Sequence, residues 1–195
     1  MPNPRAGRQM RYIPAKIQHR DDGGEPVIAC YFAVFNSPTE LWPGCIEQIA
    51  PGAFSSSLGG DVRALVDHET RLVLGRTTAG TLTLREDESG LYGEIKINPN
   101  DSDAMNLYAR VQRGDVSQCS FGFEIVSEDY IVGSDGQTCT WTIHDLILYE
   151  VSVVTFPAYE ATSAYARDVG DMASLRTARL NRRRQELLER INKLC

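Results

Sequence analysis

One serine, one histidine and one glutamate could together carry nucleophilic chemistry in this chain. Ser120 lies in the segment from Val116 to Glu124, where a small polar stretch runs into an aromatic–glycine–aromatic sequence. On an alternating strand, Ser120 shares a face with Gly122, whereas Phe121 lies on the other face. A hydroxyl beside a residue without a side chain leaves room for another backbone to approach, as a nucleophile requires. The alternative is an ordinary half-buried strand in which Ser120 bonds to the backbone.

His68 is the best placed of the three histidines to act as a base. It follows the apolar stretch 62–67 and precedes a second predicted strand, so it lies at a strand end, a common location for functional residues. An imidazole titrates near neutral pH, which suits the transfer of a hydroxyl proton to a leaving amine. The alternative is a surface histidine bonded to Asp67 or Glu69. His19 lies in a polar lead-in, where a solvated side chain is expected.

A third group must orient the imidazole and balance its charge. Residues 143–155 form an apolar alternating pattern. Burial of the Glu150 carboxylate in such a strand costs free energy unless the carboxylate is paired. Pairing with His68 would remove that cost. The alternative is an ion pair with an arginine, such as Arg76 or Arg110.

Other chemistries lack their signatures in this sequence. It contains no G-x-S-x-G elbow, phosphate-binding Gly-rich loop, H-E-x-x-H motif or C-x-x-C pair. The five scattered cysteines indicate neither a zinc site nor a disulfide framework, so we expect a reducing, intracellular setting. No apolar run reaches the roughly 20 residues that span a bilayer, and residues 1–20 lack the apolar region of a secretory signal. We therefore expect no metal, no organic cofactor and no membrane association.

The charge is unevenly distributed along the chain. The formal net charge is −6, yet residues 171–195 contain seven Arg or Lys against three Asp or Glu. The remaining acidic body does not look like a nucleic-acid-binding protein. The segment from Met172 to Leu194 lacks Pro and Gly and has an apolar side, which predicts an amphipathic helix. We therefore divide the chain into a disordered N-terminus (1–10), a main domain (11–167) and a basic helical tail (168–195).

The main domain has the pattern of many short strands. Alternating segments on either side of turn signals predict hairpins around residues 86–90 and 133–136. Capping residues before Asp103 and a glycine after Arg113 predict one helix between them, and a minor helical segment is expected to end at Leu58. The expected fold class is mainly β (α+β). The expected architecture is a small closed or nearly closed antiparallel β-barrel with a few surrounding helices, followed by the C-terminal amphipathic helix.

Three strings in this order resemble the prohead proteases of tailed phages, capsid-maturation serine proteases that are related to herpesvirus assemblin. They are ALVDHETRLVLGRT around His68, CSFGF around Ser120, and LYEVSVVTFPAYEAT at 148–162. The resemblance covers roughly residues 31–166, most of the main domain. It implies a small β-barrel with surrounding helices, Ser120 as the nucleophile and His68 as the base.

The same resemblance leaves two candidates for the third catalytic residue. Glu150 matches the family's glutamate in the E-V-S-V-V string and is the first candidate. The herpesvirus relatives use a second histidine, so His144 is the alternative. Cys119 departs from the hydrophobic residue that is more usual before the serine, which leaves a role for its thiol open.

The function implied is that of a serine endopeptidase that cleaves scaffold and major capsid protein segments, and in some cases itself, during procapsid maturation. Such an enzyme would act in the cytoplasm of the bacterial host, inside the assembling prohead. The rival function is a non-enzymatic β-barrel module that binds capsid or scaffold without cutting, because a fold does not fix a function. The distance between the Ser120 hydroxyl and His68 discriminates between the two. The oligomeric state stays open, and a homo-oligomer is compatible with the sequence.

Overall fold

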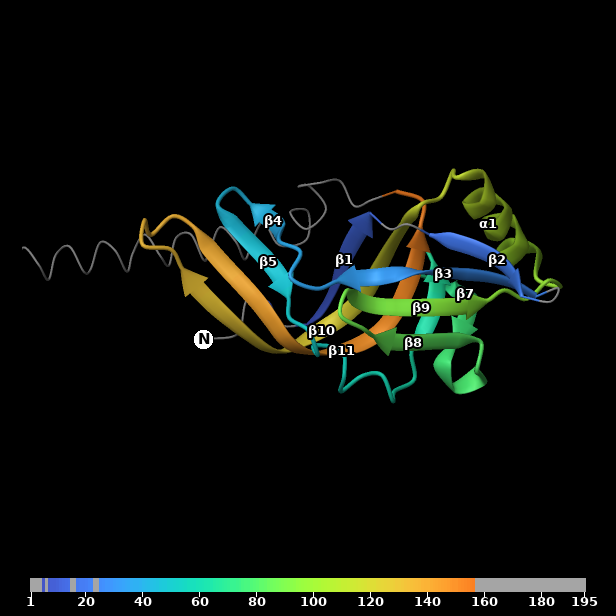
Figure 1. The fold of residues 1–195 in the computed structure, drawn as a ribbon, viewed down its shortest axis with the longest axis horizontal. Helices are drawn as coiled ribbons and strands as arrows, with labels where there is room; N and C mark the ends of the chain where they lie inside the picture. The colour runs from blue at the N-terminus through green and yellow to red at the C-terminus, as the bar shows by residue number, and fades with distance from the viewer. Residues whose placement is uncertain (1–4, 6, 15–16, 23–24, 157–195) are drawn as a thin grey trace, which may run out of the picture.

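The computed structural model describes residues 5, 7–14, 17–22 and 25–156, which form two β-sheets and one α-helix (Figure 1). The seven-stranded sheet contains β1 (Arg8–Pro14), β4 (Thr39–Trp42), β5 (Cys45–Ile49), β6 (Arg63–Val66), β7 (Glu69–Arg76), β10 (Gln118–Val132) and β11 (Cys139–Val154). The four-stranded sheet contains β2 (Gln18–Asp22), β3 (Glu25–Val34), β8 (Leu82–Glu86) and β9 (Gly90–Lys96). The helices are α1 (Ser102–Arg113) and a short 3-10 turn, η1 (Thr77–Ala79).

The two sheets do not close on themselves within the described residues. The large sheet has the order β1-β10-β11-β5-β4, with β6 and β7 attached through β11, and the small sheet has the order β2-β3-β9-β8. The mainly-β class is confirmed, but the closed or nearly closed antiparallel barrel is wrong. β11 also pairs in parallel with both β5 and β6. Local alternation predicts strands, whereas closure depends on which distant strands pair.

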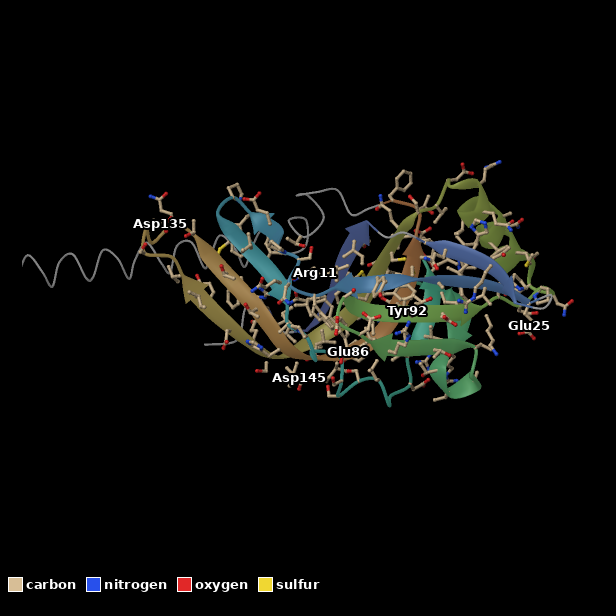
Figure 2. The ribbon with its side chains drawn as sticks, in the orientation of Figure 1. Arg11, Glu25, Glu86, Tyr92, Asp135 and Asp145 are labelled. Atoms are coloured by element: carbon tan, nitrogen blue, oxygen red, sulfur yellow. A yellow bond between two sulfur atoms is a disulfide. The ribbon has the colours of Figure 1, made fainter. Side chains whose placement is uncertain are left out.

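The hairpin of β10 and β11 gives the molecule its long axis. The two strands contain 15 and 16 residues, and their far half extends away from the small sheet beside β4 and β5 (Figure 1). Figure 2 shows Asp135, in the turn of this hairpin, at the opposite end of the molecule from Glu25 at the start of β3. The hairpin predicted around residues 133–136 is therefore the tip of a much longer one.

The predicted helix and the other hairpin are confirmed. Asp101 caps α1, because its carboxylate accepts hydrogen bonds from the backbone N–H groups of Asp103 and Ala104. Gly114 ends the helix with a φ of 85°, a left-handed conformation that suits glycine. Strands β8 and β9 form the other predicted hairpin. The minor helical segment expected to end at Leu58 is a series of turns instead.

The hydrophobic core lies between the two sheets. Phe121 and Phe123 of β10 are fully buried and stack with ring centroids 4.9 Å apart, in one cluster with Phe32 of β3. The sulfur of Cys119 lies 2.9 Å from that of Cys30 on β3, which joins the two sheets across the core. The predicted alternation of β10 is therefore confirmed: one face lines the core, and the face with Ser120 points away from it.

Part of the segment expected to be disordered belongs to a strand. β1 begins at Arg8, so the disorder expected for residues 1–10 does not hold for the end of that segment. The expected helical tail, 168–195, lies outside the described residues. In the part of the chain that the structure describes, no helix is long and apolar enough to cross a membrane.

A disulfide joins Cys45 and Cys139. The two residues lie directly opposite each other in the parallel register of β5 and β11, with Cα atoms 4.5 Å apart. The scattered cysteines indicated no disulfide framework, and the sequence pattern therefore missed this bond. They are 94 residues apart in sequence and become neighbours only through strand pairing. The cysteine pattern thus no longer argues for a reducing compartment.

Candidate active site

On the outer face of the β10–β11 hairpin, polar side chains of the two strands lie next to one another. In the antiparallel register, Ser120 lies directly opposite Ser152, and Gly122 lies opposite Glu150. Because side chains alternate along a strand, these four residues share the face that points away from the small sheet. Ser120, Ser152 and Glu150 are 0%, 0% and 2% exposed. A carboxylate this deeply buried requires polar partners.

His68 reaches this face from the tight turn between β6 and β7. Val66 pairs with Glu69, so Asp67 and His68 form a two-residue hairpin turn with φ angles of 47° and 61°. Left-handed backbone costs about 1–2 kcal/mol for each non-glycine residue. The Asp67 carboxylate accepts hydrogen bonds from the backbone N–H and the hydroxyl of Thr155, at 2.7 and 2.8 Å. These bonds tie the turn to the end of β11 and hold His68 over the sheet.

The imidazole of His68 contacts the Glu150 carboxylate. Its Nδ1 lies 2.7 Å from Oε1 of Glu150, and the His68 side chain is 10% exposed. The other carboxylate oxygen accepts a 2.6 Å hydrogen bond from the hydroxyl of Ser152, which also lies 3.4 Å from Nδ1. An Nδ1–H that donates to the carboxylate leaves the lone pair on Nε2, as a general base requires. Of the arginines named as alternatives, Arg76 binds Asp61 instead. Another arginine does lie near Glu150, because Nη2 of Arg8 is 3.4 Å from Oε1.

Gly122 makes room for this carboxylate. A methyl group at position 122 would overlap Oε1 of Glu150 and would lie 3.1 Å from Nη2 of Arg8. We expected the missing side chain to admit another backbone, but the Glu150 carboxylate fills the space. The glycine of the Phe-Gly-Phe sequence is therefore needed for the acid rather than for an approaching strand.

The hydroxyl of Ser120 does not bond to His68 in this conformation. It donates a 2.9 Å hydrogen bond to the backbone carbonyl of Arg11 on β1. Among the described residues, the buried Nε2 of His68 has no hydrogen-bond partner. The structure thus brings His68, Glu150 and Ser120 to one face, with the serine proton directed to β1 rather than to His68.

The other sequence candidates lie elsewhere. Nε2 of His144 is 2.9 Å from Oδ2 of Asp129, and the His144 side chain is 44% exposed. It is six residues from Glu150, or roughly 20 Å along an extended strand. Cys119 faces the core against Cys30, and burial together with that contact raises the pKa of the Cys119 thiol well above its usual range. A buried, protonated thiol is a poor nucleophile.

Sequence reasoning did not single out Ser152, which joins the cluster through Glu150. Its position two residues after Glu150 on one strand placed both on the same face, and that spacing was the available signal. In the part of the chain that the structure describes, no group of three or more His, Cys, Asp or Glu side chains could hold a metal ion. The arrangement provides an imidazole whose Nε2 points away from its carboxylate partner, and a serine hydroxyl on β10, the strand that pairs with the one holding that carboxylate.

Comparison with known proteins agrees with this chemistry. Residues 14–174 match the family model described as "Caudovirus prohead serine protease". The prohead protease of Enterobacteria phage HK97 is 31% identical over 161 residues, which cover 80% of this chain and 67% of the relative. The solved structure of the bacteriophage T4 capsid assembly protease superposes with a TM-score of 0.50, over 75% of this chain and 96% of that one. At 8% sequence identity, the T4 structure supports the fold alone.

Proposed function

Because this chain belongs to the caudovirus prohead serine proteases, we propose that it cleaves scaffold and major capsid protein segments during procapsid maturation. The family makes it a phage serine protease. The observation that carries the proposal about its site is the 2.7 Å contact between His68 Nδ1 and Glu150 Oε1 on the face that holds Ser120.

In the proposed mechanism, Ser120 Oγ attacks the scissile carbonyl of an extended peptide. Nε2 of His68 takes the hydroxyl proton and returns it to the leaving amine, so that an acyl-enzyme forms. Water then attacks the ester by the same route in reverse, and Ser120 regains its proton. Glu150 accepts the Nδ1–H of His68 throughout, which fixes the tautomer and stabilises the imidazolium.

Two choices within this mechanism rest on geometry. Glu150 is preferred to His144 as the third member, because Glu150 contacts His68 whereas His144 contacts Asp129. Ser120 is preferred to Ser152 as the nucleophile, because Ser152 is bonded to the acid and lies near Nδ1. A nucleophile must reach the nitrogen that is free to take its proton, which here is Nε2.

Co-expression with the major capsid protein of the same phage tests the proposal. The wild-type chain should shorten the capsid protein at a defined bond, which intact mass measurement identifies, and Ser120→Ala should leave it uncut. Family membership favours this outcome over the non-enzymatic module. Equal processing by both chains would remove Ser120 from the mechanism, and a capsid protein left uncut by the wild-type chain would favour the non-enzymatic module.

We also propose that the chain cleaves itself and acts inside the assembling prohead, in the cytoplasm of the host. A fragment of the wild-type chain that is missing from Ser120→Ala would support self-cleavage. Recovery of the inactive Ser120→Ala chain in purified proheads would support the location, and its absence from them would contradict it.

A further inference from the structure

We propose that β1 is an autoinhibitory strand. It occupies the edge of β10 where a substrate peptide would bind, so that substrate reaches Ser120 only after β1 leaves that edge. This inference rests on the proposed roles of Ser120 and His68. β1 is the outermost strand of the large sheet and pairs antiparallel with β10 from Arg8 to Pro14. Its position in the sheet is the one that an added peptide strand would take.

The register places β1 directly beside the proposed nucleophile. Tyr12 lies opposite Ser120, and the carbonyl of Arg11 accepts the Ser120 hydroxyl hydrogen bond at 2.9 Å. A serine whose proton is held by a carbonyl cannot deliver it to a base. Ser120 must therefore turn from Arg11 toward Nε2 of His68 before it can react.

β1 also contacts the base and the acid. The ring of Tyr12 meets the imidazole of His68 edge to face, with centroids 5.4 Å apart and planes at 80°. Nη2 of Arg8 lies 3.4 Å from Oε1 of Glu150. The three members of the proposed site thus each contact a different residue of this one strand. Two hollows of about 120 and 440 Å³ on the described surface are lined by neither Ser120 nor His68.

Charged contacts anchor Arg11 of β1, and Arg5 before it, to β5. Glu47 of β5 is 3% exposed and binds the guanidinium groups of both Arg5 and Arg11, the latter with an Nη2–Oε2 distance of 2.8 Å. Figure 2 shows Arg11 beside β5. The Arg5 guanidinium also lies 4.5 Å from the ring centroid of Trp141. Within the described residues β1 pairs with β10 alone, so its release breaks no other strand pairing.

The ligand that replaces β1 would be an extended peptide. Departure of β1 exposes the backbone N–H and C=O groups of β10, and a peptide strand that pairs with them brings its own carbonyl to Ser120. Since β1 is part of the chain, it competes with every substrate and keeps the protease inactive until a strand displaces it.

A disulfide that pins β1 tests the proposal on the full-length chain. Arg8 and Glu124 lie directly opposite each other, so Arg8→Cys/Glu124→Cys should form a cross-strand disulfide. The matched control, Thr83→Cys/Glu94→Cys, pins β8 to β9. The probe is a fluorophosphonate, with which the serine oxygen forms a bond to phosphorus as fluoride leaves. Labelling of Ser120 is followed by mass spectrometry with and without reductant, beside the wild type.

A release variant gives the opposite change. Arg5→Ala/Arg11→Ala removes both contacts with Glu47, and Arg71→Ala, an exposed arginine of β7, is its control. We expect the oxidised β1 lock to label at least tenfold more slowly than its reduced form, and the release variant at least tenfold faster than wild type. An oxidised lock that labels as fast as its reduced form would overturn the proposal. If Ser120 labels in no variant, the proposed nucleophile is wrong and this inference fails with it.

Discussion

Gly122 lies directly opposite Glu150, and the carboxylate of Glu150 occupies the space that any side chain at position 122 would need. Gly122→Ala should therefore displace the acid from His68 while the strands stay paired. A misplacement of about 1 Å can cost about a hundredfold in rate, and we expect a loss of that size in kcat/KM. Gly59→Ala is the control, because nothing lies within 4 Å of a methyl group there. Wild-type activity in Gly122→Ala would show that the position of Glu150 is not critical.

Glu150→Gln and His144→Ala decide the third member of the site. Glu150→Gln keeps the shape but presents an amide to His68, and we expect kcat to fall by about three orders of magnitude, short of complete loss. His144→Ala removes a partly exposed side chain that contacts Asp129, so kcat should stay within about twofold of wild type. The reverse order of the two losses would establish the arrangement with two histidines.

His68 combines a chemical role with a strained backbone. Its φ of 61° is unfavourable for alanine but not for glycine. Both His68→Ala and His68→Gly should abolish cleavage, and the glycine variant should be more stable by about 1 kcal/mol. Urea unfolding of the two proteins measures the difference. An alanine variant as stable as the glycine variant would mean that the turn relaxes when the imidazole is removed.

The buried Glu47 should make stability depend on pH. Burial acts to raise the pKa of Glu47, but the charges of Arg11 and Arg5 outweigh it and hold that pKa below its usual value. Ionised Glu47 therefore stabilises the fold above its unfolded-state pKa of about 4.3, and this contribution is lost as pH falls through the lower folded-state value. Removing one partner from a buried ion pair costs about 3 kcal/mol, so Glu47→Gln should be less stable by about that amount at pH 7.

The same variant should lose part of the pH dependence. Between about pH 5 and pH 3, the free energy of unfolding should fall less in Glu47→Gln than in the wild type, because its residue 47 cannot be protonated. Glu25→Gln, at an exposed position at the start of β3, is the control and should follow the wild type. Denaturant unfolding across this range measures all three proteins, and equal slopes would show that Glu47 does not carry the effect.

Local patterns in the sequence predicted the elements of the site. Alternation placed Ser120 and Phe121 on opposite faces of β10, and the capping residues located α1 within one residue at its start. The cost of a buried carboxylate indicated that Glu150 needs a partner, and in the structure His68 is one of its partners, together with Ser152 and Arg8. These inferences hold because each depends on near neighbours or on the chemistry of a single side chain.

The relations between distant segments could not be predicted in this way. The pairing of β1 with β10 joins residues more than 100 positions apart, and it decides where the Ser120 hydroxyl points. The disulfide between Cys45 and Cys139 also depends on which distant strands pair, and so does the absence of a closed barrel among the described strands. A strand pattern does not specify its partner, so a barrel and two open sheets are equally consistent with it.

We propose that Ser120, and not the opposite Ser152 or the adjacent Cys119, is the nucleophile. The most direct test of this proposal is the rate of capsid protein cleavage by Ser120→Ala, Ser152→Ala and Cys119→Ala under identical conditions. We expect no detectable cleavage by Ser120→Ala, a reduced but measurable rate for Ser152→Ala because Glu150 loses one hydrogen bond, and a rate near wild type for Cys119→Ala. Cleavage by Ser120→Ala together with complete loss in Ser152→Ala or Cys119→Ala would contradict the proposal.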